Sequence, residues 1–443
     1  MGTRAPFKPF QSTAPGTRWS GPTRVAFRFC FVYFSLYSLA THIFGGLLLF
    51  PNVSFPGLGL VWPMREITMW CATHIFRATS PLVYIGNSGD TVFHWVQTFW
   101  LLTVSVIATA SWSELDRVRD DYVTLHTWFR LFIRFAVASQ MLYYGMAKVI
   151  PTQFPPPSLV TLVEPVGNLS VTDLLWTSIG ASTTYQIFTG CAELVAGVLL
   201  LVPRTTALGA MVSLADMIQV FVLNMAYDFG LKQISFHLIL MSLFLLAPDV
   251  PRLANVFVLN RASGPANHPS LFTHRRANRV ALVVQILFGI YLLGMHTRLS
   301  LTYWYGDGGP GSAKSPLYGI WNVDQLSVDG QLRSPILNDY DRRWRRVIFD
   351  SPNRMAFQRT DDSFVHYDIA VDVRGGTLAL TKRNSSSWRA SFTFSRPSSE
   401  RLTVDGEMDG HRIHMELQLV NLDTFRLLNS RFRWIRPPDP YGG

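Results

Sequence analysis

The chain has 443 residues, of which 48% are hydrophobic and only 15% are charged, and its formal net charge is +10. Soluble domains carry about 25% charged residues, so the composition argues against a wholly soluble protein. Much of the basic excess flanks hydrophobic runs, which is typical of membrane topology, and nucleic acid is not an expected partner. The three cysteines are far apart and form no CxxC pair, so neither a disulfide framework nor a metal site is expected.

Charge is distributed unevenly along the chain. Residues 1–296 hold 19 Lys/Arg and 12 Asp/Glu, whereas the shorter segment 297–443 holds 20 and 17. The first part is therefore expected in a membrane and the last part in water. The predicted organisation is a disordered basic N-terminal tail (1–23), a transmembrane helical domain (24–297), a linker (298–315) and an extracytoplasmic β-domain (316–443).

Seven hydrophobic runs approach the ~20 residues that an α-helix needs to cross a bilayer. With the N-terminus inside, the inner segments hold 13 Lys/Arg and the outer connections hold 3. This bias predicts that the β-domain lies outside the cytoplasm. The predicted spans are 25–50, 91–112, 123–149, 184–202, 205–224, 232–248 and 278–296.

Two connections on the predicted outer side are long. Residues 63–76, within the connection 51–90, have the composition of an interfacial amphipathic helix. Residues 151–183 contain three consecutive prolines and a Trp-bearing stretch. Long connections with such content are often lids or binding loops, so we expect the outer face to be the working side.

Charged side chains interrupt the predicted spans. They include Arg134, Lys148, Glu193 and Asp216. An ionised group at bilayer depth costs roughly 2.5–3.5 kcal/mol on insertion scales, so such residues usually face a bundle interior, pair with each other or serve a site. Arg134 is a candidate partner for the two carboxylates in a purely structural ion pair.

A polar stripe ends the third predicted helix. Gln140, Tyr144 and Lys148 follow an i, i+4, i+8 spacing, and Tyr143 lies next to them. Burial disfavours the charged form of a lysine, which would let Lys148 act as a base while tyrosine and glutamine hold a carbonyl oxygen. Such a cavity suits an isoprenoid quinone that enters from the bilayer. In the alternative interpretation, Lys148 extends to the membrane interface and the tyrosines only pack.

Two further residues join the candidate site. Asp90 immediately precedes the second predicted helix and is either a ligand contact or a helix cap. His237 lies in the sixth predicted helix and is either a ligand contact or a hydrogen-bonded structural histidine. The predicted catalytic residues are Lys148, Tyr144, Glu193 and Asp216, and the predicted ligand-binding residues are Gln140, Tyr143, Asp90 and His237.

From residue 316 onward the hydrophobic pattern has a period of two. Alternation is clear in 364–373, 388–394 and 411–419, and it predicts an antiparallel all-β barrel or sandwich of eight to ten strands. His411 and His414 are three apart on a strand, so they point to opposite faces and cannot share a metal. The predicted turns are Asp329-Gly330, Gly375-Gly376, Asp405-Gly406 and Asp409-Gly410.

The ends of this β-domain carry a tryptophan and an arginine. Gly319-Ile-Trp321 is predicted to open the first strand, and Arg431-Phe-Arg-Trp434 is predicted to close the last. This arrangement resembles the closing pair of lipocalin-type barrels. A small barrel either holds a ligand or is filled by its own side chains, and the filled form is favoured here.

Residues 134–157 and 190–209 together resemble the DoxX-like family of bacterial membrane proteins. The resemblance covers about residues 123–248 and is carried by the Tyr143-Tyr144-Gly-Met-Ala-Lys148 segment and by Gly190-Cys-Ala-Glu193 before a small-residue helix and an Arg-Thr turn. Tyr143 to Lys148 is also similar to a segment of the HTTM membrane domain of vitamin K-dependent gamma-carboxylases. That similarity implies base chemistry on a reduced quinone at Lys148, although no propeptide-binding region is evident.

These observations lead to two hypotheses. The first is a DoxX-like, multi-pass protein of a bacterial cytoplasmic membrane that binds, oxidises or reduces a quinone-type molecule at an outward-facing site, and hence a candidate quinone-linked oxidoreductase. The second is a non-enzymatic membrane scaffold whose β-domain binds a periplasmic protein partner or lipid. Transport is less favoured because the sequence contains no inverted repeat.

Overall fold

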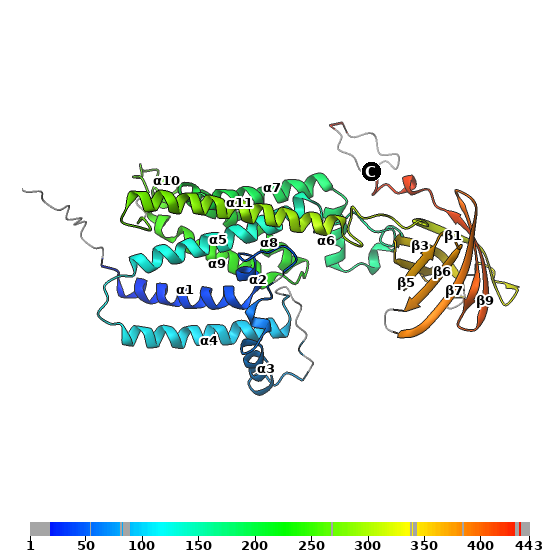
Figure 1. Cartoon of the computed structure of the whole chain (residues 1–443), viewed down its shortest axis with the longest axis horizontal. Helices are drawn as coiled ribbons and strands as arrows, with labels where there is room; N and C mark the ends of the chain where they lie inside the picture. The colour runs from blue at the N-terminus through cyan, green and yellow to red at the C-terminus, as the bar shows by residue number, and fades with distance from the viewer. Residues whose placement is uncertain are drawn as a thin grey trace, which may run out of the picture. The chain divides into compact units, whose positions relative to one another are not determined.

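The computed structural model divides the chain into two units (Figure 1). The helical unit comprises Met1–Tyr143 and Glu193–Met295, and the β unit comprises Tyr144–Ala192 and His296–Gly443. The structure describes residues 18–53, 55–79, 82, 89–266, 269–336, 339, 343–382, 385–429 and 434–435.

The N-terminal region is helical, as the sequence predicts. Within the described residues, five helices are long and apolar enough to cross a membrane: Val92–Leu115, Thr183–Leu201, Pro203–Ala226, Lys232–Phe257 and Arg275–Tyr305. The helices are α1 (Gly21–Ala40), α2 (His42–Gly45), α3 (Met64–His74), α4 (Val92–Leu115), α5 (Val123–Val149), α6 (Val171–Gly180), α7 (Thr183–Leu201), α8 (Thr206–Ala226), α9 (Lys232–Leu246), α10 (Val250–Phe257) and α11 (Arg275–Tyr305).

The first predicted span ends earlier than the hydrophobic run does. Helix α1 stops at Ala40 rather than near residue 50, because Thr41 adopts an extended backbone and its hydroxyl donates to the carbonyl of Tyr37 at 2.8 Å. The short helix α2 follows, and Gly57 packs so tightly against the end of α1 that a Cβ there would lie 2.5 Å from the Ala40 carbonyl oxygen. The chain therefore leaves the helix at Thr41, whose hydroxyl satisfies one of the last carbonyl groups of α1.

Helix α5 supplies much of the core of the helical unit. Ile133, Ala136, Val137 and Met141 are fully buried, together with apolar residues of α1, α4 and α9. Polar groups on the same stretch of α5 are therefore also removed from solvent. This placement requires each of them to find a hydrogen-bond partner inside the bundle.

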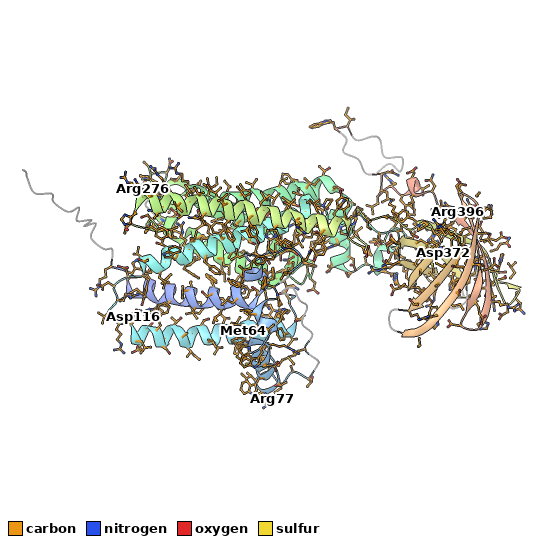
Figure 2. The ribbon with its side chains drawn as sticks, in the orientation of Figure 1. Met64, Arg77, Asp116, Arg276, Asp372 and Arg396 are labelled. Atoms are coloured by element: carbon orange, nitrogen blue, oxygen red, sulfur yellow. The ribbon has the colours of Figure 1, made fainter. Side chains whose placement is uncertain are left out.

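One end of the helical unit is held together by a buried arginine. Arg28 of α1 donates to the Tyr122 hydroxyl, to Ser113 Oγ at 2.8 Å and to the Asp116 carbonyl at 2.7 Å. Tyr122 in turn donates to the Asp116 carboxylate, which lowers the pKa of Asp116. Figure 2 shows Asp116 at this end together with Arg276, whereas Met64 and Arg77 lie at the opposite end of the unit.

The β unit contains an eight-stranded antiparallel barrel. Sequential strands pair in chain order, and β1 pairs with β9 to close the barrel, while the two-residue β2 pairs only with the end of β1. The barrel alternative of the sequence prediction is thus confirmed. The strands are β1 (Gly319–Val328), β2 (Gln331–Leu332), β3 (Trp344–Ser351), β4 (Arg354–Arg359), β5 (Phe364–Asp372), β6 (Thr377–Lys382), β7 (Ser385–Ser398), β8 (Arg401–Met408) and β9 (His411–Leu419).

Large side chains pack the core of this barrel. Trp321, Phe349, Phe357 and Phe392 are fully buried in one apolar cluster, and Trp344 stacks on Phe357 with ring centroids 4.0 Å apart. This packing agrees with the filled form favoured by the sequence. Barrels of eight strands are just wide enough for their side chains to fill.

Two details of the β prediction were wrong. Asp405-Gly406 is not a turn but part of β8, where a Cβ at Gly406 would lie 2.4 Å from the Phe392 ring, so glycine allows this close approach. The barrel closes through β9, which ends at Leu419, and Trp434 lies in no strand; residues 431–433 are outside the described residues. The arginine over the Trp321 ring is Arg396 of β7, at 5.7 Å from the ring centroid.

The connection after α5 packs on the outer wall of the barrel. Leu159 joins Ile320, Ile348 and Ala356 in a small apolar core, and its backbone N–H donates to Asp350 Oδ1 at 2.9 Å. Gln358 donates to the Val163 carbonyl at 3.2 Å. This long connection is therefore a built part of the β unit.

Candidate functional site

Asp90 begins a series of polar contacts in the helical unit. Its carboxylate accepts from the backbone N–H of Lys232 at 2.6 Å and of Gln233 at 3.0 Å. Asp90 therefore caps the start of α9, a helix distant in sequence, whereas the sequence suggested a cap on the helix that follows it. Carboxylates favour such positions because they satisfy free N–H groups and the positive end of the helix dipole.

The series continues from α9 to α1 through a histidine. His237 Nδ1 donates to the Gln233 carbonyl at 2.6 Å, so Nε2 is the acceptor for the Tyr33 hydroxyl, also at 2.6 Å. Tyr37 stacks on the imidazole with ring centroids 3.5 Å apart and planes 8° apart. Asp90, Gln233, His237 and Tyr33 thus form one hydrogen-bonded series, which we call the Asp90–Tyr33 network.

Gln233 leaves one polar atom of this network without a partner. Its side chain is 5% exposed, and Oε1 accepts from Thr98 Oγ1 of α4 at 2.7 Å. Nε2 finds no hydrogen-bond partner within the described part of the chain. If the amide oxygen and nitrogen were exchanged, Nε2 would donate to Thr98 and Oε1 would be the atom without a partner. A buried polar group without a partner costs roughly 1–3 kcal/mol, so Gln233 Nε2 is a donor that a polar atom of another molecule could satisfy.

A second polar group lies on α5. His42 Nε2 donates to Gln140 Oε1 at 2.9 Å, and Ser139 Oγ donates to the Gly46 carbonyl at 2.7 Å. Gly46 lies so close that a Cβ there would be 2.9 Å from Gln140 Nε2. The predicted ligand-binding residue Gln140 is thus buried against α2 and the turn that follows it.

Lys148 and Tyr144 lie on the part of α5 that belongs to the β unit. Lys148 is 7% exposed, so it does not extend freely into the surroundings, and Tyr144 is half-buried. Helix α7 approaches this point through Gly190, where a Cβ would lie 2.7 Å from Lys148 Cβ and 2.8 Å from the Gly145 carbonyl oxygen. Only a residue without a side chain fits this crossing, which accounts for glycine at the start of the Gly190–Glu193 motif.

The two predicted acidic residues lie in the helical unit. Glu193 is 1% exposed and, by helical repeat, shares a face of α7 with Gly190 and Gly197. Asp216 of α8 is half-buried, as is Tyr143 of α5. Arg134, the ion-pair partner suggested by the sequence, donates to Gln285 of α11.

Sequence reasoning missed part of the network. Tyr33, Tyr37, Thr98 and Gln233 were not selected, although Tyr33/Tyr37 and Gln233/His237 are each spaced i, i+4 on an otherwise apolar helix. That spacing places each pair on one helical face and was the available signal.

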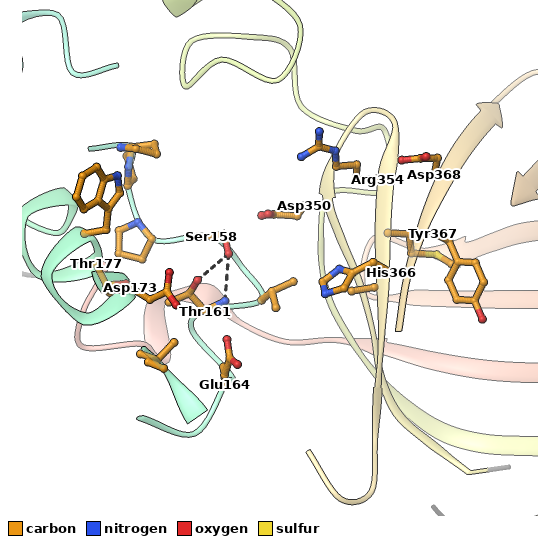
Figure 3. A pocket seen from close by; sticks show the side chains of 18 residues that line it. Ser158, Thr161, Glu164, Asp173, Thr177, Asp350, Arg354, His366, Tyr367 and Asp368 are labelled. Atoms are coloured by element: carbon orange, nitrogen blue, oxygen red, sulfur yellow. Dashed lines mark hydrogen bonds between the residues drawn. The ribbon is translucent and has the colours of Figure 1, made fainter. Parts of the chain in front are cut away.

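The β unit contains a pocket of about 580 Å³ between the connection that precedes α7 and the outer wall of the barrel (Figure 3). Ser158 Oγ accepts from the Thr161 backbone N–H at 3.1 Å and orders one side of it. Figure 3 shows Arg354 and His366 pointing toward the pocket from the barrel wall, with Asp173 on the opposite side. The lining residues are Pro155, Pro156, Pro157, Ser158, Val160, Thr161, Glu164, Leu169, Asp173, Trp176, Thr177, Asp350, Arg354, Met355, Ala356, His366, Tyr367 and Asp368.

Two acidic groups of this pocket have structural partners. Asp350 accepts from Leu159, and Asp173 forms a capping box with Ser170 at the start of α6. Trp176 donates to the Gln153 carbonyl at 3.1 Å and packs against Phe154. Among the described residues, no group of three or more His, Cys, Asp or Glu side chains could hold a metal ion.

Comparisons with known proteins give one informative relative. A Bacillus subtilis (strain 168) protein described as "uncharacterized protein YwoB" is 35% identical over 129 residues, which cover 79% of that protein and 29% of this chain. No model of a known protein family matches the chain, and no solved structure matches it.

Proposed function

The chain belongs to the same protein family as YwoB of Bacillus subtilis, and we propose that it is a multi-pass membrane protein that binds a lipid-soluble, quinone-type molecule in its helical unit. The proposed topology has seven spans, with α1 and α5 added to the five apolar helices and the N-terminus inside. The 13 to 3 distribution of Lys/Arg supports this orientation and places the β unit outside the cytoplasm.

The observation that carries the proposal is the incomplete hydrogen bonding of Gln233. Its amide lies at the centre of the Asp90–Tyr33 network, and its Nε2 is buried without a partner in the described residues. Sites for small apolar molecules combine apolar walls with a few placed polar groups, and the Gln233 amide would be such a polar group inside an apolar bundle. A quinone carbonyl would accept from such a donor, and the molecule would reach it from the bilayer.

The predicted residues on α5 and α7 have a supporting role in this proposal. The similarity of Tyr143 to Lys148 to a segment of the HTTM domain of vitamin K-dependent gamma-carboxylases implies that Lys148 acts as a base toward a reduced quinone, and Tyr144, Glu193 and Asp216 are further candidate polar groups. A quinone would supply two-electron chemistry when bound. At Gln233 the helical unit would contribute orientation of the molecule and exclusion of water.

A binding titration tests this proposal. A short-chain ubiquinone analogue is titrated into the protein in lipid nanodiscs, and tryptophan quenching reports binding. Gln233→Leu removes the unpartnered amide, and the loss of one hydrogen bond should weaken binding about threefold to tenfold. Ser213→Ala is the matched control, because Ser213 is also buried but is hydrogen-bonded to Ser242. Equal binding by both variants would contradict the proposal.

A second candidate function is a non-enzymatic scaffold whose β unit binds a periplasmic partner or lipid. The pocket of Figure 3 favours it, because about 580 Å³ is within the size range of small-molecule sites. Glu164→Gln and His366→Ala change its lining without removing either structural carboxylate. Cells that carry each variant are compared with cells that lack the protein. If Glu164→Gln or His366→Ala reproduces the effect of lacking the protein while Gln233→Leu does not, the scaffold function is favoured.

A further inference from the structure

Helix α3 is joined firmly to the helical unit by one face. Trp100 Nε1 of α4 donates to Thr68 Oγ1 at 2.9 Å, and Gln97 Nε2 donates to the Gly59 carbonyl at 2.9 Å. Thr68, Cys71 and Ala72 form its buried face. Figure 1 shows that α3 runs across the direction shared by α1 and α4, beside the half of α4 that begins at Val92.

Five large apolar side chains of α3 and its flanks are exposed, next to the exposed Arg65 and Glu66 of the same helix. Trp62 is 80% exposed and Trp70 is 56% exposed, and Ile67, Ile75 and Phe76 are exposed as well. We call these five residues the aromatic collar. Contiguous apolar surfaces of this kind are rare on soluble monomers and mark an interaction site.

The collar is continuous with the outward face of α4. Phe76 packs edge-on against Phe99, with ring centroids 5.0 Å apart. Exposed residues of α4 recur at the helical spacing i, i+3, i+7, i+10, i+14, on a helix apolar enough to cross a membrane. They are Val92, Trp95, Phe99, Leu102 and Val106. If α4 spans a membrane, lipid covers these five exposed side chains. The aromatic collar adjoins them and would then also contact lipid.

We propose that α3 lies in the plane of the membrane interface and that the aromatic collar binds lipid at the boundary between headgroups and acyl chains. Three observations support this occupant: α3 crosses the direction of α1 and α4, it lies beside the half of α4 that begins at Val92, and its surface continues from that of α4. Tryptophan favours this depth because its ring is apolar and its N–H is polar. The exposed Arg65 and Arg77 flank the helix, where anionic headgroup oxygens would meet them.

Spin-label accessibility tests the proposal in the full chain. Cys30, Cys71 and Cys191 are replaced by serine or alanine, and one nitroxide is attached after Trp70→Cys in lipid nanodiscs. Collisions with oxygen report lipid, and collisions with a water-soluble nickel chelate report water. Val106→Cys, in mid-helix of α4, is the lipid control, and Leu332→Cys, on the barrel, is the water control.

The expected oxygen-to-nickel ratio at position 70 lies between the two controls and several-fold above that at position 332. A ratio equal to that at position 332 would place the collar in water and overturn the proposal. Protection of position 70 from both reagents would mean that protein covers the collar, which also overturns it. Trp62→Cys repeats the measurement at the most exposed collar position, so misfolding of one variant does not decide the result. The quinone proposal is independent, because Gln233→Leu leaves the collar intact.

Discussion

The two units place their polar side chains in opposite ways. In the helical unit, Gln233 and His237 lie inside and are hydrogen-bonded to each other, Gln140 is buried in a second polar group with His42, and the exposed large side chains of α4 are apolar. In the β unit, the core is apolar and polar residues pair across the surface, as His414 does with Asp405 at 2.6 Å. The outer surface of α4 therefore suits an apolar medium, whereas the paired charges on the barrel surface suit water.

The pocket of the β unit follows the same logic. It lies on the outer wall of the barrel, between a covering connection and exposed strand residues, because the interior is already occupied by Trp321 and Phe349. Ligand binding by this unit would therefore use surfaces added to the barrel. Ligand binding by the helical unit would use its interior.

The largest expected effect comes from opening the barrel core. Phe392→Ala should destabilise the β unit by about 3–5 kcal/mol, because the side chain is fully buried and its removal leaves a cavity. Urea unfolding in detergent, followed by tryptophan fluorescence, measures the change. Leu332→Ala is the control, since Leu332 is 68% exposed. If the two variants lowered the free energy of unfolding equally, the barrel interior would not be the stabilising core of the β unit.

A smaller effect is expected at the crossing of α5 and α7. Gly190→Ala should destabilise the protein by about 1–3 kcal/mol, because the new Cβ meets backbone and the Lys148 stem with no flexible atom to move. Gly294→Ala is the matched control, since a Cβ at Gly294 in α11 has nothing within 4 Å. Thermal unfolding of both variants in detergent decides the point. If Gly190→Ala is as stable as Gly294→Ala, the close packing at Lys148 is wrong.

Removing one hydroxyl from the network should cost less. Tyr33→Phe leaves His237 Nε2 without its donor, which predicts a loss of about 1–2 kcal/mol in stability. Tyr303→Phe is the matched control, because it removes the same hydroxyl from a residue that is 63% exposed. Melting temperatures of the two variants should differ, with Tyr303→Phe close to the unchanged protein. Equal melting temperatures would show that the network contributes nothing to stability.

The weakest expected effect concerns a surface pair of the barrel. The hydrogen bond from His411, and then that from the Arg412 backbone N–H, lowers the pKa of Asp329 below 3.8. A lowered folded-state pKa means that the stabilisation is present above pH 3.8 and is lost as pH falls through the lower, folded value. The melting temperatures of the unchanged protein and Asp329→Asn should therefore converge only below pH 3.8. A difference that is constant from pH 7 to pH 3 would contradict this assignment.

Local sequence patterns predicted where helices and strands lie, whereas the roles of single residues such as Gly406 depend on contacts with residues distant in the sequence. Alternation from 411 to 419 gave β9 with its observed bounds, because side chains alternate between two faces of a strand. The length of the hydrophobic runs located α4 and α7 to α9 to within a few residues. Gly406 was assigned to a turn because its role depends on the ring of Phe392 in a neighbouring strand, which no local window contains.

The candidate site was less predictable for the same reason. Charge inside apolar runs located Lys148 and Glu193, and both are buried. The hydrogen bond from Tyr33 to His237 joins residues 204 positions apart, so only the fold brings them together. Asp90 was placed at the wrong helix because its partners on α9 follow it by more than 140 residues.

The most direct test of the central claim is the quinone content of the protein purified in native lipid. Organic extraction and mass spectrometry would quantify isoprenoid quinone per mole of protein, with Gln233→Leu prepared in parallel. The account predicts quinone retained by the unchanged protein above the level of the surrounding lipid and lowered in the variant. Quinone at the lipid background in both preparations would contradict a quinone-type site in the helical unit.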